Sequence, residues 1–328
     1  MPKKNKPLYV KLIANPGAGD KQKAGARLAE VTRYLTEFGV KVDVALAHPK
    51  REATPIARRA IQDGYDAVIA MGGDGTLGAV IRGIAGSKMR LGIIAAGTEN
   101  DIAKSLGIPE DLKEACALIA SGNTRKLDLG QISTTKRKKF YFFMMAAVGL
   151  TATIFPMVKE VPEGKYSGVR GALATFLKFK TKPKVYLTLD GESKIEVETM
   201  LVTIANTPLI GLKNLVAPEA SMEDGLLDIS VFPGFTKAMV LRYFAQTANK
   251  GSPPDGSIQR YRAHTISIKT SPKLDIAAEG ILLGKGTARI KTLPGALRVI
   301  APKAGTGTEK PLKKSAQKLA APLSTVAK

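Results

Sequence analysis

The pentapeptide Gly72-Gly73-Asp74-Gly75-Thr76 directly follows the apolar run 67–71. The run is typical of a buried parallel strand, and the apolar spacing of 77–84 predicts a helix after the turn. Glycines let a polyphosphate approach the backbone, and a helix N-terminus offers unpaired N–H groups to an anion. A carboxylate at Asp74 suits a Mg²⁺ ion or a nucleotide hydroxyl better than a phosphate. The pattern therefore predicts a phosphate-binding turn at the end of a strand.

Two similar loops lie nearby in the chain. A predicted strand over 8–14 ends in Asn15-Pro16-Gly17-Ala18-Gly19, and another over 91–96 ends in Gly97-Thr98-Glu99-Asn100-Asp101. Predicted helices over 21–38 and 53–63 alternate with these strands and with a strand over 40–47, which favours a parallel sheet covered on both faces. Ligands of such sheets bind beyond the carboxyl ends of the strands, so we expect the three loops to lie together.

The pattern changes after about residue 123. Short strands are predicted over 127–133, 139–148, 184–189, 195–205, 227–232 and 265–269, with helices over 171–179 and 237–246. This succession is typical of a mainly antiparallel β-sandwich. A last strand over 296–301 is expected to return to the first domain. The predicted domains are an α/β domain over 7–126, joined by 293–302, a sandwich over 127–292 and a basic tail over 303–328.

The net charge of +22, from 50 Lys and Arg against 28 Asp and Glu, attracts polyanions. Sparse aromatic residues, 5% of the chain, argue against nucleic acid as the partner. The single cysteine, Cys116, rules out an intrachain disulfide and agrees with a cytoplasmic protein. The uncharged run 140–158 contains Gly149 and Pro156, which favours a buried strand and loop over a membrane span. No P-loop sequence, G-x-x-x-x-G-K-[ST], is present.

In their order along the chain, these motifs resemble the bacterial diacylglycerol kinase-like lipid kinases. That family shares its catalytic domain with sphingosine and ceramide kinases, and the central signature also occurs in NAD kinases and phosphofructokinases. The segments that carry the resemblance are the three glycine loops, Asn206, 218–228 and 294–299. The resemblance implies ATP contacts from Asn15, Pro16, Gly17, Ala18, Gly19, Gly72, Gly73, Asp74, Gly75, Thr76, Leu77 and Thr98. It also implies Asp101 near the transferred phosphate, and a structural Mg²⁺ held by Ser221, Asp224 and the backbone of Leu226.

Two positions depart from the family pattern. The asparagine that follows the signature leucine is Gly78 here. The family's Asp-Gly-Glu, whose glutamate is the proposed base, matches Glu279-Gly280-Ile281, so the base position holds an isoleucine. Three explanations stay open: Glu279 serves as the base, Asp101 serves instead, or the protein binds nucleotide with little turnover. If 279–281 is extended, Glu279 and Ile281 point to the same side.

The function that the resemblance implies is an ATP- and Mg²⁺-dependent kinase that phosphorylates a hydroxyl of diacylglycerol or a related lipid. The expected partners are a lipid substrate and an anionic membrane surface, with no nucleic acid, and a homodimer is possible. The expected location is the cytoplasm, peripherally on the membrane. The alternatives are a soluble NAD kinase-like enzyme and a catalytically weak nucleotide- or lipid-binding protein.

Overall fold

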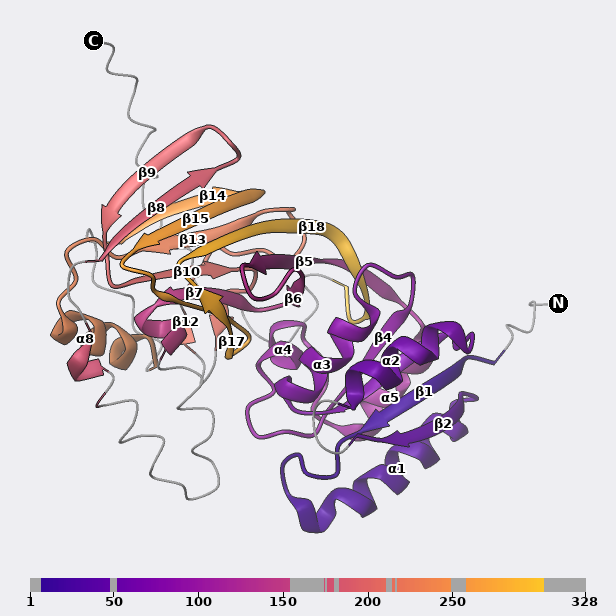
Figure 1. Cartoon of the computed structure of the whole chain (residues 1–328). Coiled ribbons are helices and arrows are strands. Elements are labelled where there is room, and N and C mark those ends of the chain that lie inside the picture. Colours follow the sequence, from indigo (N-terminus) through magenta and orange to yellow (C-terminus); the bar gives the residue numbers. More distant parts are fainter. Residues whose placement is uncertain are drawn as a thin grey trace.

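The computed structural model describes residues 7–47, 52–153, 174, 176–179, 183–210, 214–215, 217–248 and 258–303. Strands and helices alternate through the first domain, which lies on the right in Figure 1. In chain order its elements are β1 (Tyr9–Ala14), η1 (Lys21–Lys23), α1 (Ala24–Glu37), β2 (Lys41–Leu46), α2 (Ala53–Gln62), β3 (Ala67–Gly72), α3 (Asp74–Ile84), β4 (Arg90–Ala95), α4 (Asp101–Ser105) and α5 (Leu112–Ser121).

Strand β3 lies at the centre of this domain, and all six of its residues are buried. Its alternate side chains enter two different hydrophobic clusters, because successive residues of a strand point to opposite faces. Val68 and Ala70 pack with residues of α2 and α3, whereas Ile69 and Met71 pack with residues of α1 and α5. The near-continuous apolar sequence of β3 is thus explained by helices on both faces of the sheet.

The first sheet has the strand order β2-β1-β3-β4-β18-β15-β8-β9, and β5 (Thr124–Thr134) also pairs with β18. Strands β1 to β4 pair in parallel. The long strand β18 (Thr287–Ile300) pairs with β15 in the second domain and, further along, in parallel with β4 in the first. In Figure 1 it curves from one half of the molecule into the other. The two halves therefore share one continuous sheet.

The second domain is a sandwich of antiparallel strands. One layer contains β5, β6 (Phe140–Phe142), β8 (Lys184–Leu189), β9 (Ser193–Glu198), β15 (Thr265–Ser271) and the first part of β18. The other layer has the order β14-β13-β10-β7-β16-β17, with β7 at Met145–Gly149, β10 at Leu201–Ala205, β13 at Leu227–Val231, β14 at Gln259–Ala263, β16 at Asp275–Ala278 and β17 at Ile281–Lys285. Side chains of both layers form one buried cluster. The short pair β11 (Leu209–Ile210) and β12 (Asn214–Leu215) and helix α8 (Lys237–Ala248) complete the described elements.

Two segments that we predicted as single strands each cross between the layers. The segment 139–148 is divided into β6 and β7, and 195–205 into β9 and β10. At the first crossing, the carboxylate of Glu279 binds backbone N–H groups of 143–145. At the second, the hydroxyl of Thr199 bonds the carbonyl groups of Leu201 and Phe232. Side-chain partners thus replace the ladder bonds at both breaks.

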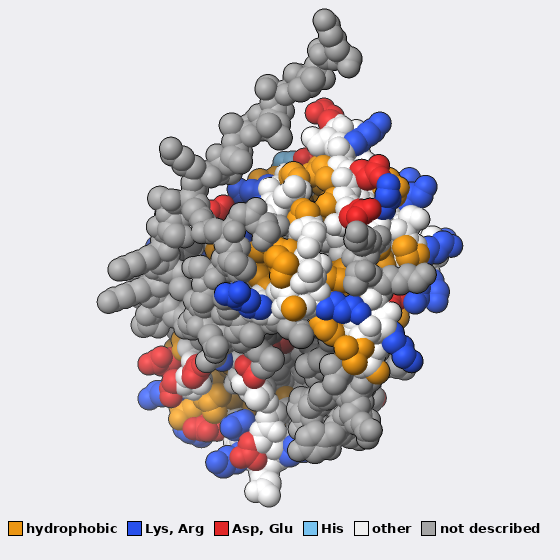
Figure 2. All heavy atoms as spheres, turned by 90° about the vertical axis from the view of Figure 1, so that its left-hand side faces the viewer, with side chains coloured by type: hydrophobic (Ala, Val, Ile, Leu, Met, Phe, Trp, Pro, Cys, Tyr) orange, Lys and Arg blue, Asp and Glu red, His pale blue; other side chains and the backbone are white. Residues whose placement is uncertain are grey.

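The predicted fold class, an α/β domain with a parallel sheet and a mainly antiparallel sandwich, is confirmed. Within the described ranges, no helix has the length and hydropathy that a membrane-spanning helix needs. Figure 2 shows Lys and Arg side chains around patches of hydrophobic side chains on one face of the molecule. The glycine-containing segment 156–174, a candidate lid, lies outside the described residues except for residue 174, and so does nearly all of the tail 303–328.

Candidate active site

The three glycine loops leave the parallel sheet at one edge. The strand register pairs Ala14 with Met71 and Gly72 with Ala95, so β1, β3 and β4 end at the same level. A backbone bond from Ala96 N to Gly72 O, 3.1 Å, continues the pairing into the loops. The loops over 15–19, 72–77 and 97–101 are therefore neighbours, as the sequence predicted.

The first loop is fastened to the second by Asn15. Its Nδ2 donates to Oγ1 of Thr76 at 2.9 Å, and its Oδ1 accepts from the N–H of Gly17 at 3.0 Å. Its own N–H donates to the carbonyl of Met71 at 3.0 Å. The buried Thr76 hydroxyl thus accepts a bond from Asn15. Helix α3 begins at Asp74, three residues earlier than predicted, because the N–H groups of Thr76 and Leu77 already bond to the carbonyl of Gly73.

Glycines let the three loops approach more closely than side chains would permit. A Cβ built on Gly97 would lie 2.4 Å from Cα of Gly73, which real Cβ atoms do not tolerate. A Cβ on Gly19, whose φ is +63°, would lie 2.5 Å from the carbonyl oxygen of Ala96. At these two points the loop surface is consequently made of backbone, and helix α3 begins directly after Gly73. Such a surface fits a polyphosphate, because N–H groups can reach its oxygens.

The carboxylate of Asp74 connects the second loop to the third. It accepts from the backbone N–H of Asp101 at 3.2 Å and of Ile102 at 3.0 Å, so it caps the short helix α4. Asn100 adopts a left-handed conformation with φ 56° and accepts from the N–H of Gly97 at 2.9 Å. Asp101 is only 3% exposed. Asp74 thus fixes the position of Asp101, a role that its sequence context did not reveal.

Glu279 and Gly280 form a two-residue hairpin turn between β16 and β17. Their φ angles are 53° and 72°, and the turn places Ala278 opposite Ile281. The segment is therefore not extended, and the two-residue spacing does not place Glu279 and Ile281 on one side of a strand. Oε1 of Glu279 accepts from the backbone N–H groups of 143, 144 and 145 at 3.1, 2.8 and 3.3 Å.

The hairpin turn touches the nucleotide domain at Gly78. A Cβ on Gly78 would lie 3.8 Å from Oε2 of Glu279 and 3.3 Å from Nη1 of Arg82. The guanidinium of Arg82 also lies over the ring of Phe140, 5.2 Å from its centroid. Burial lowers the pKa of Arg82, and the nearby Glu279 opposes that shift. Arg82 was missed in the sequence, although it follows Gly78 by one helical turn on the same face of α3.

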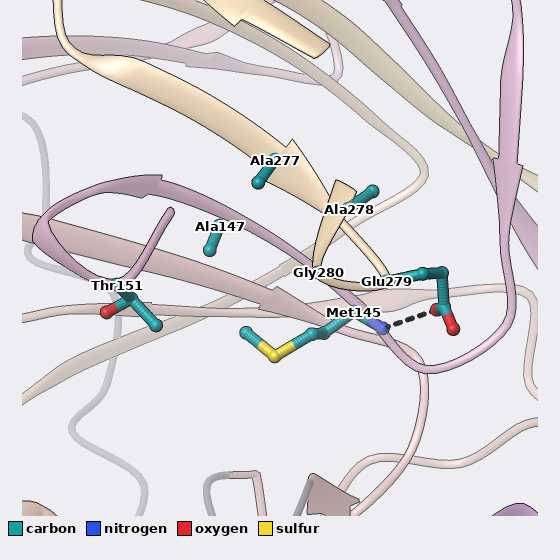
Figure 3. A pocket seen from close by; sticks show the side chains of 7 residues that line it. All are labelled: Met145, Ala147, Thr151, Ala277, Ala278, Glu279 and Gly280. Carbon is teal, nitrogen blue, oxygen red and sulfur yellow. Dashed lines mark hydrogen bonds between the residues drawn. The ribbon is translucent and has the colours of Figure 1, made fainter. Parts of the chain in front are cut away.

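A small pocket adjoins the same turn (Figure 3). Its lining is mostly apolar and comes from β7, the residues after it, and the β16–β17 hairpin: Met145, Ala147, Thr151, Ala277, Ala278, Glu279 and Gly280. Its volume is about 10 Å³, room for one water molecule. The carboxylate of Glu279 points away from the pocket toward the backbone that it binds (Figure 3).

In the segment expected to hold a structural Mg²⁺, the side chains of the candidate ligands already bond to other groups of the chain. Oδ1 of Asp224 accepts from the N–H of Leu226 at 3.0 Å, and its other oxygen is paired with Arg262. The hydroxyl of Ser221 accepts from the N–H of Glu223 at 3.2 Å. Among the described residues, no group of three or more His, Cys, Asp or Glu could hold a metal ion. The oxygen donors suit Mg²⁺, but the positive charge beside Asp224 is that of Arg262, so metal binding here stays a prediction.

Asp128 connects this segment to the rest of the junction between the domains. It is 2% exposed, and its two oxygens accept from the N–H groups of Gly225 and Gly295, both at 2.7 Å. The buried Asn206 donates to the carbonyl of Asp128 at 3.1 Å and to that of Phe143 at 2.8 Å. Asp128 was missed because an isolated Asp inside a predicted strand carries no motif.

Comparisons with known proteins agree with this arrangement. Residues 9–132 match the diacylglycerol kinase catalytic domain, and 146–301 match the YegS C-terminal NAD kinase beta sandwich-like domain. A diacylglycerol kinase of Mycobacterium tuberculosis (strain CDC 1551 / Oshkosh) is 30% identical over 300 residues, which cover 90% of this chain and 96% of the relative.

Two solved structures have a similar fold. A diacylglycerol kinase from Bacillus anthracis str. Sterne aligns with a TM-score of 0.72 at 24% identity, over 92% of this chain and 99% of the other. An NAD kinase from Archaeoglobus fulgidus, crystallised with ATP, aligns with a TM-score of 0.52 at 11% identity, over 90% and 94% of the two chains.

Proposed function

The chain belongs to the diacylglycerol kinase family of lipid kinases, and from this membership we propose that it transfers the γ-phosphoryl group of ATP, with Mg²⁺, to a hydroxyl of diacylglycerol or a related lipid at a membrane surface. The observation that carries the proposal is the meeting of three glycine loops at one sheet edge, beside a hairpin turn of the second domain. Nucleotide and acceptor would then meet where the two domains join.

On the nucleotide side, the loops over 15–19 and 72–77, with Thr98, would hold the phosphates and the nucleoside. Asn15 and Asp74 already fix the loops to one another, and Asn100 fixes the third loop internally. ATP-bound Mg²⁺ would neutralise charge on the phosphates, and Asp101 is the carboxylate that we propose near it. Phosphoryl transfer depends mainly on such positioning and charge neutralisation.

On the acceptor side, the residues beside the hairpin turn are mostly apolar, which favours a lipid over a dinucleotide as the acceptor, although the pocket that they line holds only one water molecule. Asp101 is the residue that we propose to receive the proton of the acceptor hydroxyl. What favours it over Glu279 is that Oε1 of Glu279 already accepts three N–H bonds and faces away from the pocket. With Asp101 in that role, Ile281 at the family's glutamate position is compatible with turnover.

The test is transfer of labelled γ-phosphate from ATP to diacylglycerol in mixed micelles. We expect wild type to turn over and Asp101→Asn to lose at least about 100-fold in kcat, the usual scale of a catalytic carboxylate. Glu192→Gln, an exposed hairpin-turn residue far from the loops in sequence, is the matched control and should keep full activity.

Other outcomes would identify the alternatives. Phosphorylation of NAD without phosphorylation of any lipid would replace the proposal by a soluble NAD kinase. ATP binding without turnover, together with activity gained by Ile281→Glu, would indicate a weak or inactive kinase.

A further inference from the structure

The turn between β5 and β6 carries four consecutive cations: Lys136, Arg137, Lys138 and Lys139. All four are exposed. Within the part of the chain that the structure describes, none of them forms an ion pair with an acidic side chain. Arg137 and Lys139 instead lie over the rings of Phe140 and Tyr141, at 5.9 and 4.9 Å from the centroids. The turn is therefore a compact cluster of positive charge that the described chain leaves uncompensated.

Strand β17 presents two large apolar side chains beside that turn. Strand β17 lies at the edge of its sheet, where Ile281 is 37% exposed and Leu282 is 53% exposed. An exposed apolar edge strand is an aggregation hazard unless another surface covers it. The next two residues, Leu283 and Gly284, are buried, so the exposure is confined to the end of the strand nearest the hairpin turn.

Direct contacts join the basic turn to β17. Oγ1 of Thr134 donates to the carbonyl of Leu283 at 2.7 Å. A Cβ on Gly284 would lie 3.8 Å from Cβ of Lys136. The basic turn thus contacts β17 at Leu283 and Gly284, directly after the exposed Ile281 and Leu282. We call the four cations of 136–139 together with Ile281 and Leu282 the docking face.

We propose that the docking face seats the protein on an anionic phospholipid bilayer, with the cations at the lipid phosphates and Ile281 and Leu282 in the interfacial layer. This inference rests on the proposed function and names the surface that would bring the enzyme to its substrate. Positive charge and apolar surface side by side match a bilayer, which offers negative headgroups and hydrocarbon together. Nucleic acid would match the cations but leave the apolar pair exposed to water.

The position of the docking face agrees with a lipid acceptor. Ile281 directly follows the Glu279–Gly280 turn that lines the apolar pocket. Phe140, at the other end of the basic turn, contacts Arg82 of α3 in the nucleotide domain. A bilayer seated on this face would therefore lie beside the junction where we place phosphoryl transfer, which shortens the path of a lipid from the membrane to that junction.

The test is co-sedimentation of the full-length protein with vesicles of phosphatidylglycerol and phosphatidylcholine, against vesicles of phosphatidylcholine alone. Since each Lys near an anionic surface is worth about fivefold in partitioning, Lys136→Glu with Lys138→Glu should weaken binding at least about 30-fold. Ile281→Ser with Leu282→Ser should weaken it about tenfold or more. The matched control, Arg58→Glu with Lys113→Glu, changes the charge equally on α2 and α5 and should stay within about threefold of wild type.

Three results would overturn the inference: unchanged binding by the Lys136/Lys138 variant, equal losses in the Arg58/Lys113 control, or no effect of the two serines. Unchanged binding would place attachment elsewhere, for example on the basic tail. Loss of oligonucleotide binding by the Lys variant, with no effect of the serines on vesicles, would indicate a nucleic-acid surface instead.

Activity separates this inference from the proposed function. With a short-chain, monomeric diacylglycerol, the Lys136/Lys138 variant should phosphorylate as fast as wild type, and with long-chain substrate in anionic vesicles it should be slower. Wild type that binds vesicles but phosphorylates no lipid would refute the proposed function and leave the docking face standing. An active wild type, together with unimpaired vesicle binding by the Lys136/Lys138 variant, would refute the docking face and leave the proposed function standing.

Discussion

Removing the carboxylate of Glu279 should lower the free energy of unfolding and leave the rate of phosphoryl transfer nearly unchanged. One oxygen of Glu279 accepts three backbone bonds at the crossing from β6 to β7. A hydrogen bond to a charged group contributes about 1.5–3 kcal/mol, and three donors that share one oxygen are not additive, so we expect Glu279→Ala to cost about 3 kcal/mol. Glu279→Gln keeps an acceptor oxygen and loses only the charge, so it should cost about 1 kcal/mol.

Urea unfolding followed by far-UV circular dichroism measures both variants, with Glu192→Ala as the exposed hairpin-turn control. Micelle kinase assays on the same preparations should give Glu279→Gln a kcat within about threefold of wild type. Equal destabilisation by the alanine and glutamine variants would refute the anchoring role. A hundredfold lower kcat for Glu279→Gln at nearly native stability would instead make Glu279 the base.

Three further changes test other parts of the site. Gly97→Ala forces the loops apart at Gly73 and should raise KM for ATP at least about tenfold. The control Gly25→Ala adds its methyl group in open space on α1 and should raise the Tm of the protein slightly. Burial raises the pKa of Asp228 to about 6, so the native state binds its proton more tightly and stability falls as pH rises from about 4 through 6. Asp228→Asn should therefore raise Tm at pH 7.5 and change it little at pH 4, and a Tm gain independent of pH would contradict this. Mg²⁺ should raise Tm of Arg262→Met more than that of wild type, because the guanidinium and the ion compete for Asp224; equal responses would contradict that competition.

The parallel domain was predictable because its signals are local. Each strand is a short apolar run, each loop carries glycine, and the rule that loops meet at the carboxyl edge places residues 15, 72 and 97 together. Helix boundaries were also close, except at Asp74, where the carbonyl of Gly73 accepts two N–H bonds and starts α3 early.

The second domain was predicted less completely because its decisive contacts join residues far apart in the chain. Nothing near residue 143 shows that Glu279, over a hundred residues later, ends β6 there. The hairpin turn at Glu279–Gly280 needs two positive φ angles, and only Gly280 signalled one. Asp224 looked like a metal ligand, while its partner Arg262 lies in a strand that the sequence did not reveal.

Strand β18 has a consequence for how the chain is made. Arg298 pairs with Arg90, and the residues between them include the whole sandwich. On a ribosome, β4 would emerge long before its partner strand, with one edge open until synthesis is nearly finished. Pairing across such a sequence distance is slow to form and leaves strand edges exposed to other chains. The nascent α/β domain should therefore depend on chaperones, and a fragment that ends before residue 287 should aggregate rather than fold.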